Sequence, residues 1–280
     1  MDKYALLYDA VRQLPDIVFH EAPKIELERL LVAHDKAYID RVVTGQLSSE
    51  EIKEIGFPWS PRMVERSLRS VGATYHAALS AMNHGIAASL AGGTHHAHRS
   101  RGSGFCVFND IAVASLNLLE EFTHLNIVVV DLDVHQGDGT AAILNTHQQI
   151  FTFSMHGENN YPFTKEKSHL DIALPDGCND NHYLKQLEES LTAIEQLIKP
   201  DFVFYLAGTD PHENDRLGRL KLSEQGLYQR DKTVFEWVKK HQANCAVVMG
   251  GGYGNEINTT VALHTNTIRL ALQYNSQSPY

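Results

Sequence analysis

Residues 126–139 read Asn-Ile-Val-Val-Val-Asp-Leu-Asp-Val-His-Gln-Gly-Asp-Gly, a short apolar run that ends in acids, a histidine and glycines. A run of β-branched residues this short, followed at once by turn residues, is typical of a strand buried on both faces of a parallel sheet. Similar runs occupy residues 150–154, 202–206 and 246–249. These runs predict the strands of a parallel sheet.

Helical patterns separate the predicted strands. Between residues 183 and 198, leucine and isoleucine recur at helical spacing, and Lys199-Pro200 ends the pattern. Because strand and helix alternate, we expect a single α/β domain over residues 1–280, with an open, mainly parallel sheet and helices on both faces. In such sheets the ligand site lies beyond the carboxyl ends of the strands. The other predicted helices cover residues 62–88, 112–121 and 228–241.

Candidate metal ligands follow two of the predicted strands. Asp133 and His135 are two residues apart, so on an extended segment their side chains point the same way. Asp210 follows the run 202–206 and supplies a third ligand. An Asp/His/Asp set leaves positions open for water and substrate, as a catalytic site requires, and its oxygen and nitrogen donors suit Zn²⁺ or Fe²⁺. The alternative is that these acids only cap helices or bind backbone amides.

Two adjacent histidines form a second candidate group. His95 and His96 follow Gly92-Gly93, where we expect an irregular backbone. We interpret them as a general acid and base beside a metal-bound water, with Asp131 and Asp138 orienting the imidazoles. A structural histidine beside an exposed one is the alternative. Two further histidines have no expected role, because they suit a solvated loop and a helix face: His98 and His84.

A tyrosine follows the glycines of the last predicted strand. Gly250-Gly251-Gly252 lets backbone and substrate approach closely, and the phenol of Tyr253 can donate to the oxyanion of a tetrahedral intermediate. The spacing of these glycines does not fit the G-x-G-x-x-G dinucleotide fingerprint.

Five segments together resemble the ordered motifs of the histone deacetylase superfamily, whose fold is similar to that of arginase. Gln136, at a position where the better-known classes carry a second histidine, is similar to the class IV branch, and so is the segment 213–218. The five segments cover residues 92–97, 104–110, 131–139, 207–210 and 250–253.

The resemblance implies a role for each matching residue. It implies zinc ligands, two His–Asp pairs, an oxyanion-stabilising tyrosine, an acyl channel and a potassium ion near the zinc. The ligands would be Asp133, His135 and Asp210, the pairs His95–Asp131 and His96–Asp138, the tyrosine Tyr253, the channel residues Gly104, Phe105 and Gly251, and the potassium ligands backbone oxygens with Asp131 and Ser154.

The implied function is zinc-dependent removal of an acyl group, acetyl or long-chain fatty acyl, from lysine or another amine. A small-molecule amidohydrolase acting on an acetylpolyamine-type substrate remains an alternative. An arginase-like ureohydrolase needs two metal ions and leaves the histidine pair and Tyr253 unexplained. A non-catalytic acyl-lysine-binding module would be expected to have lost a ligand, the histidine pair or the tyrosine.

The resemblance also bears on the amino-terminus. Superfamily members usually carry another strand before the helix that begins here near Asp2-Lys3-Tyr4. We therefore expect that strand to be missing, with Met1 a truncated or misassigned start.

Net charge, apolar runs and cysteines argue against a nucleic-acid-binding, membrane-spanning or disulfide-bonded protein. The net charge of −10 argues against direct binding of nucleic acid phosphates. We find no run of about 18 apolar residues that would span a membrane. The three cysteines are scattered and form no disulfide framework, which predicts a reducing cytoplasm.

Overall fold

The computed structural model describes residues 2–276 of the 280-residue chain, so Met1 lies outside the described residues. Its centre is a six-stranded sheet in the order β1-β6-β5-β2-β3-β4, and every neighbouring pair is parallel. The prediction of an open parallel α/β sheet is therefore confirmed. The strands are β1 (Ile86–Ser89), β2 (Ile127–Asp131), β3 (Ile150–Gly157), β4 (Leu170–Leu174), β5 (Phe202–Leu206) and β6 (Asn244–Val248).

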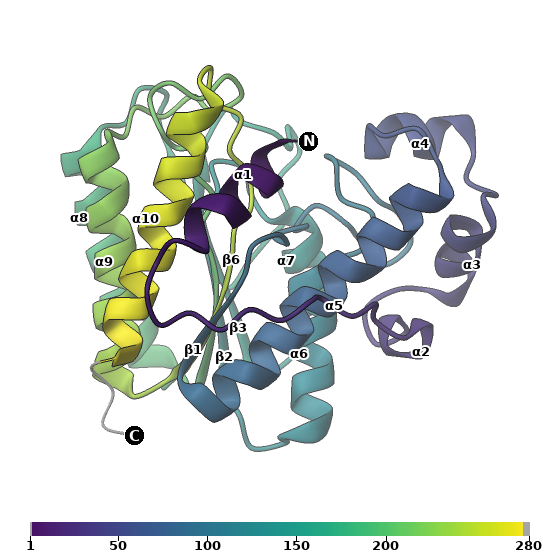
Figure 1. Ribbon diagram of the computed structural model, residues 1–280, viewed down its shortest axis with the longest axis horizontal. Coiled ribbons are helices and arrows are strands. Elements are labelled where there is room, and N and C mark those ends of the chain that lie inside the picture. The colour runs from purple at the N-terminus through teal and green to yellow at the C-terminus, as the bar shows by residue number, and fades with distance from the viewer. Residues whose placement is uncertain (1, 277–280) are drawn as a thin grey trace.

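Side chains that alternate along the central strands pack into two separate cores. Val128 and Val130 of β2 belong to one core, and Ile127 and Val129 belong to the other. Helices therefore cover both faces of the sheet (Figure 1). None of the helices within residues 2–276 is long and apolar enough to cross a membrane.

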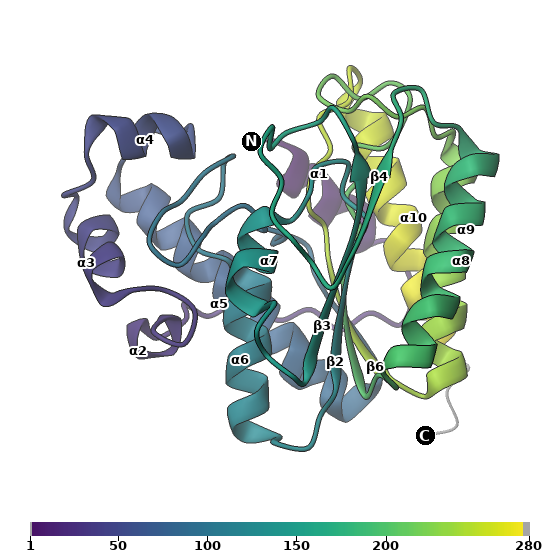
Figure 2. The ribbon, with the colours of Figure 1, turned by 180° about the vertical axis from the view of Figure 1, so that it is seen from behind.

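The helices divide between these faces. One face is covered by α1 (Asp2–Val11), α8 (Asp180–Leu197), α9 (Glu224–His241) and α10 (Ile257–Ser276). The other is covered by α5 (Pro61–His84), α6 (Asp110–Glu121) and α7 (Asp138–Leu144). Figure 2 shows both layers from behind, with three short helices in a lobe beyond α5: α2 (Leu27–Leu30), α3 (Lys36–Thr44) and α4 (Ser49–Ile55).

The helix predicted over residues 62–88 ends earlier than expected. α5 begins after the N-cap Ser60 and ends at His84, because the following Gly85 has a φ of 86° that breaks the helix. Residues beyond it form β1, in which Ile86 lies opposite Cys245 of β6. The prediction of helix through Ala88 was wrong because Ile-Ala-Ala has no strand signature of its own; pairing with β6 makes it a strand. β4, at the opposite edge of the sheet, was likewise not predicted.

The chain order creates a switch point between β2 and β5. From β2 the chain continues outward through β3 and β4 and then returns to form β5 on the other side of β2. Asp131 at the end of β2 lies opposite Leu206 at the end of β5. The segments that follow these two strands therefore emerge side by side, which is where ligand sites of open α/β sheets form.

Removing Phe204 should test the core that supports this edge. Phe204 is fully buried in the centre of β5, so Phe204→Ala should lower the free energy of unfolding by about 3–5 kcal/mol. Urea denaturation followed by circular dichroism measures the change. Leu197→Ala, at a residue 71% exposed, is the matched control and should shift stability by no more than about 0.5 kcal/mol. Equal losses in the two variants would contradict the assignment of Phe204 to the core.

Candidate active site

Asp133, His135 and Asp210 meet at the carboxyl ends of β2 and β5. One potential ligand atom from each residue lies within 4.8 Å of the other two. The imidazole Nδ1 of His135 lies 2.9 Å from Asp133 Oδ1 and 3.3 Å from Asp210 Oδ2. The Asp210 oxygen is buried and makes no hydrogen bond within the protein. A buried carboxylate oxygen without a donor fits a site built to bind a cation.

The electrostatics of these three residues also favour a cation. Burial and the negative charge of Asp133 raise the pKa of Asp210 to about 7. Burial alone would lower the pKa of His135, but its hydrogen bond with Asp133 and the nearby carboxylate of Asp210 raise it to about 10. The cluster therefore attracts positive charge, and the donor set of two carboxylates and one imidazole suits Zn²⁺ or Fe²⁺.

Each of the adjacent histidines contacts its own carboxylate. His95 Nδ1 lies 2.7 Å from Asp131 Oδ2, and His96 Nδ1 lies 2.6 Å from Asp138 Oδ1. The two imidazole centroids are 4.1 Å apart, although neighbours on a regular strand would diverge. The preceding Gly93 has a φ of 78°, so the backbone is irregular, as the sequence analysis expected.

The two imidazoles differ in basicity. Burial opposes the charge on His95, but the carboxylates of Asp131 and Asp133 outweigh it and raise its pKa to about 9. Burial, reinforced by the positive charge of His95, lowers the pKa of His96 to about 4. Near neutral pH the pair therefore carries one positive charge, on His95, while neutral His96 keeps one ring nitrogen free to accept a proton.

His98 is closer to this pair than the sequence analysis expected. Its side chain is only 12% exposed, and its Nε2 lies 3.0 Å from Asp138 Oδ2. The placement of His98 on a solvated loop was wrong, because the loop folds back over the start of α7. Asp138 thus accepts from two imidazoles, which outweigh burial and lower its pKa well below the usual range. His84, by contrast, is the exposed last residue of α5.

Gly104, Phe105 and Tyr253 line the mouth of the cavity above these residues. Phe105 is 46% exposed, and its ring centroid lies 6.3 Å from that of Tyr253. A Cβ on Gly104 would lie 2.6 Å from the His96 ring, so only glycine fits there. Burial raises the pKa of Tyr253, which keeps its hydroxyl protonated and able to donate.

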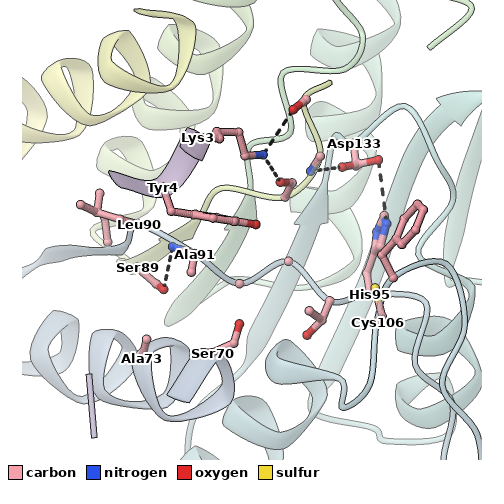
Figure 3. A pocket seen from close by; sticks show the side chains of 18 of the residues that line it. Lys3, Tyr4, Ser70, Ala73, Ser89, Leu90, Ala91, His95, Cys106 and Asp133 are labelled. Carbon is pink, nitrogen blue, oxygen red and sulfur yellow. Dashed lines mark hydrogen bonds and ion pairs between the residues drawn. The ribbon is translucent and has the colours of Figure 1, made fainter. Parts of the chain in front are cut away.

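The cavity extends well beyond this mouth. Its volume is about 2520 Å³, and it continues past Leu90 and Ala91 along the open edge of β1, between α5 and α10. Figure 3 shows that stretch, with Lys3 and Tyr4 of α1 on one side and Ser70 and Ala73 of α5 on the other. Because the open sheet edge contributes to it, the volume is not that of an acyl channel alone.

The comparisons with known proteins agree with this geometry. Residues 1–268 match the family model described as the histone deacetylase domain. The chain belongs to the histone deacetylase family.

Among its relatives is an uncharacterized protein of Picosynechococcus, 41% identical over 266 residues that cover 95% of this chain and 88% of the relative. Histone deacetylase 2 of Arabidopsis thaliana is 30% identical over 83% of this chain, which spans 62% of that protein. The crystal structure of an HDAC homologue from Aquifex aeolicus superposes with a TM-score of 0.83 at 26% identity, over 96% of this chain and 77% of the homologue. The chain is thus a histone deacetylase-family hydrolase.

The remaining predicted residues of this deacetylase-family chain lie beside the site. Gly251 donates its backbone N–H to Asp133 Oδ2 at 2.7 Å, so it borders a candidate ligand. Ser154 lies opposite Asp131 in the sheet, but its hydroxyl contacts His156 Nδ1 at 3.0 Å. A potassium ion at Asp131 and Ser154 stays a prediction, as do the catalytic roles of the other residues.

Sequence reasoning missed several supporting residues. The carboxylate of Asp110 accepts from Gly93 N at 2.9 Å and from Thr94 N at 2.7 Å, and so fixes the loop that carries the histidines. Lys3 Nζ lies 3.4 Å from the carbonyl oxygens of Gly250 and Gly252. Asp110 falls within a segment that resembles the family, whereas Lys3 gives no signal in the sequence, because its partners lie at the other end of the chain.

Asp210→Asn should weaken zinc binding, because it removes one anionic ligand from the cluster. Changes to residues that only support metal ligands typically cost about 10–100-fold in affinity, so loss of a direct ligand should cost at least about 100-fold. Competition with a chromophoric chelator measures the dissociation constant. Asp176→Asn, an exposed carboxylate paired with Arg219, is the control and should bind as the parent does. Equal affinities in the two variants would remove Asp210 from the ligand set.

Proposed function

We propose that this protein is a zinc-dependent deacylase that hydrolyses the amide between an acyl group and the amine of lysine or another amine. The observation that carries the proposal is the convergence of three groups on one cavity. These groups are the Asp/His/Asp cluster, the two His–Asp pairs and Tyr253. Each has a separate task in amide hydrolysis, and they come from segments far apart in the chain.

The proposed mechanism assigns those tasks to atoms. Zinc held by Asp133, His135 and Asp210 would supply a Lewis acid that polarises the acyl carbonyl and acidifies water. His96, neutral near pH 7, accepts the proton of the attacking water, and Asp138 holds its other nitrogen.

Two further groups complete the reaction. The hydroxyl of Tyr253 donates to the oxyanion that forms as water adds to the carbonyl. The histidine pair, which then holds the transferred proton, protonates the departing amine as the C–N bond breaks. Water thus supplies the hydroxyl of the released acid and one proton of the released amine.

The two alternative enzymes make different demands on the site. An arginase-like enzyme uses aspartates to hold a second metal ion, whereas here Asp131 and Asp138 are each engaged by a histidine. This pairing favours the deacylase. A small acylated amine such as an acetylpolyamine requires the same chemistry, so only substrate tests separate it from acyl-lysine.

Two finer assignments belong to the proposal. Class IV membership rests on Gln136 and the segment 213–218. The Gln136 side chain donates to Asp171 and exchanges hydrogen bonds with the backbone of Glu166, so it fastens the segment before β4. A cytoplasmic location rests on the three cysteines, which are all free and buried.

Hydrolysis of matched acetyl-, octanoyl- and myristoyl-lysine peptides tests the proposal directly. Turnover should disappear on metal removal and return with Zn²⁺, and the rates should rank the acyl chains. Tyr253→Phe should lower kcat by about 10²–10³-fold, the usual cost of losing one oxyanion donor, at unchanged zinc content. Tyr228→Phe, on α9 and outside the cavity, is the matched control. A folded, zinc-loaded protein that is inactive on every peptide but active on an acetylpolyamine would point to the small-molecule enzyme.

Asp138→Asn tests the acid–base pair separately from the metal. General acid–base catalysis contributes about 10²–10⁴-fold, so weakening the support of His96 should lower kcat at least about 10-fold. Steady-state kinetics of the zinc-loaded variant, with metal content verified, measure the effect. Asp176→Asn again serves as the control, and unchanged kcat in Asp138→Asn would argue against His96 as the base.

A further inference from the structure

Tyr253 stands on a loop that does not fix its own conformation. Gly250 and Gly252 have φ values of 60° and 145°, a region that glycine adopts readily and other residues rarely. A glycine-rich backbone has more conformations to lose than any other when it is ordered. Contacts outside the loop must therefore hold the tyrosine in place.

The segment after β5 supplies such contacts. The backbone N–H of Tyr253 donates to Asp215 Oδ2 at 2.6 Å. Its carbonyl oxygen accepts from Arg216 Nε at 2.9 Å and from the Arg216 backbone N–H at 3.3 Å. Asp215 and Gly254 also form an isolated antiparallel bridge. Both polar groups of the Tyr253 backbone are thus held by two consecutive residues, which we call the clamp.

The clamp is itself rigidly built. Asp215 Oδ1 accepts from the backbone N–H groups of Leu217 at 2.8 Å and Gly218 at 3.0 Å, which closes a tight turn. A Cβ on Gly218 would lie 2.0 Å from the carbonyl oxygen of Asp210, so this turn packs against the candidate metal ligand. One continuous segment, 210–218, therefore carries both a ligand and the anchor of Tyr253.

The clamp is better suited to positioning Tyr253 than to stabilising the fold. Asp215 is half-buried and Arg216 is exposed, and a single hydrogen bond of such residues adds little net free energy to folding. Catalysis, however, is sensitive to position, and a displacement of about 1 Å can cost about 10²-fold in rate. A tyrosine that must meet an oxyanion beside the metal needs its backbone fixed relative to that metal.

We infer that Asp215 and Arg216 are positioning residues that hold Tyr253 in register with the metal ligands. The inference rests on the proposed function, because it assumes that Tyr253 acts on the reacting carbonyl. It gives a role to the segment 213–218, none of whose residues takes part in the proposed mechanism.

A double-mutant cycle tests the clamp. In the otherwise unchanged, zinc-loaded enzyme, Asp215→Ala should lower kcat by about 10–100-fold while KM changes less than about 3-fold, because only a transition-state contact is lost. In the Tyr253→Phe background the same substitution should change kcat less than about 2-fold, since the hydroxyl it positions is gone. Arg216→Ala should follow the same pattern, and Arg216→Lys should recover part of the loss.

Controls separate the clamp from folding and from the metal site. Lys232→Ala removes a surface cation of α9 that lies outside the cavity and pairs with Glu236, and it should leave kcat unchanged. Zinc content and the urea midpoint are measured for every variant. If Asp215→Ala does not fold, the Arg216 variants still test the clamp, because Arg216 binds the carbonyl oxygen of Tyr253.

The outcomes distinguish this inference from the proposed function. Equal losses from Asp215→Ala in both backgrounds, or no loss in either, would overturn the clamp while Tyr253→Phe remains impaired. Full activity of Tyr253→Phe would instead overturn the role of the tyrosine, and the clamp with it.

Discussion

The structure depends on keeping several carboxylates buried together at the ends of β2 and β5. Asp131, Asp133, Asp138 and Asp210 are all buried, and an isolated buried carboxylate is costly. Each is stabilised by a specific partner. Val134 N donates to Asp210 at 2.9 Å and Gly251 N donates to Asp133 at 2.7 Å, while imidazoles contact Asp131 and Asp138. The remaining negative charge suits the binding of a divalent cation.

A buried arginine also stabilises the segments that follow β2 and β5. Arg230 of α9 is fully buried, and its Nη1 donates to the carbonyl oxygens of Gly208 at 2.6 Å and Leu132 at 3.4 Å. These carbonyls lie next to the segments that carry the candidate ligands. Arg230 is in turn paired with Asp231 at 2.7 Å, so the buried pair adds no net charge beneath the site.

Much of this site could be predicted from the sequence, because its residues follow strands that are easy to recognise. Asp133 and Asp210 lie a few residues beyond runs of buried apolar residues, and the carboxyl ends of parallel strands share one edge. Residues whose partners are backbone atoms far along the chain could not be predicted. Lys3 and Asp215 contact the glycine loop through its carbonyl and N–H groups, which every residue possesses. β1 escaped prediction for a related reason, since its four residues become a strand only by pairing with β6.

The glycines around the site follow from the same close packing of carboxylates. A Cβ on Gly251 would lie 2.0 Å from Asp210 Oδ2, and one on Gly208 would lie 2.5 Å from Asp133 Oδ2. Neither position could hold a side chain without displacing a candidate ligand. The backbone therefore approaches the carboxylates closely enough for Gly251 to donate to one of them, which lowers the cost of burying it. The same lack of side chains leaves the loop with little intrinsic stiffness. The glycines leave room for the candidate ligands, but they do not fix the conformation of the loop. Hydrogen bonds from α1 and from the segment after β5 to the backbone of this loop supply that constraint.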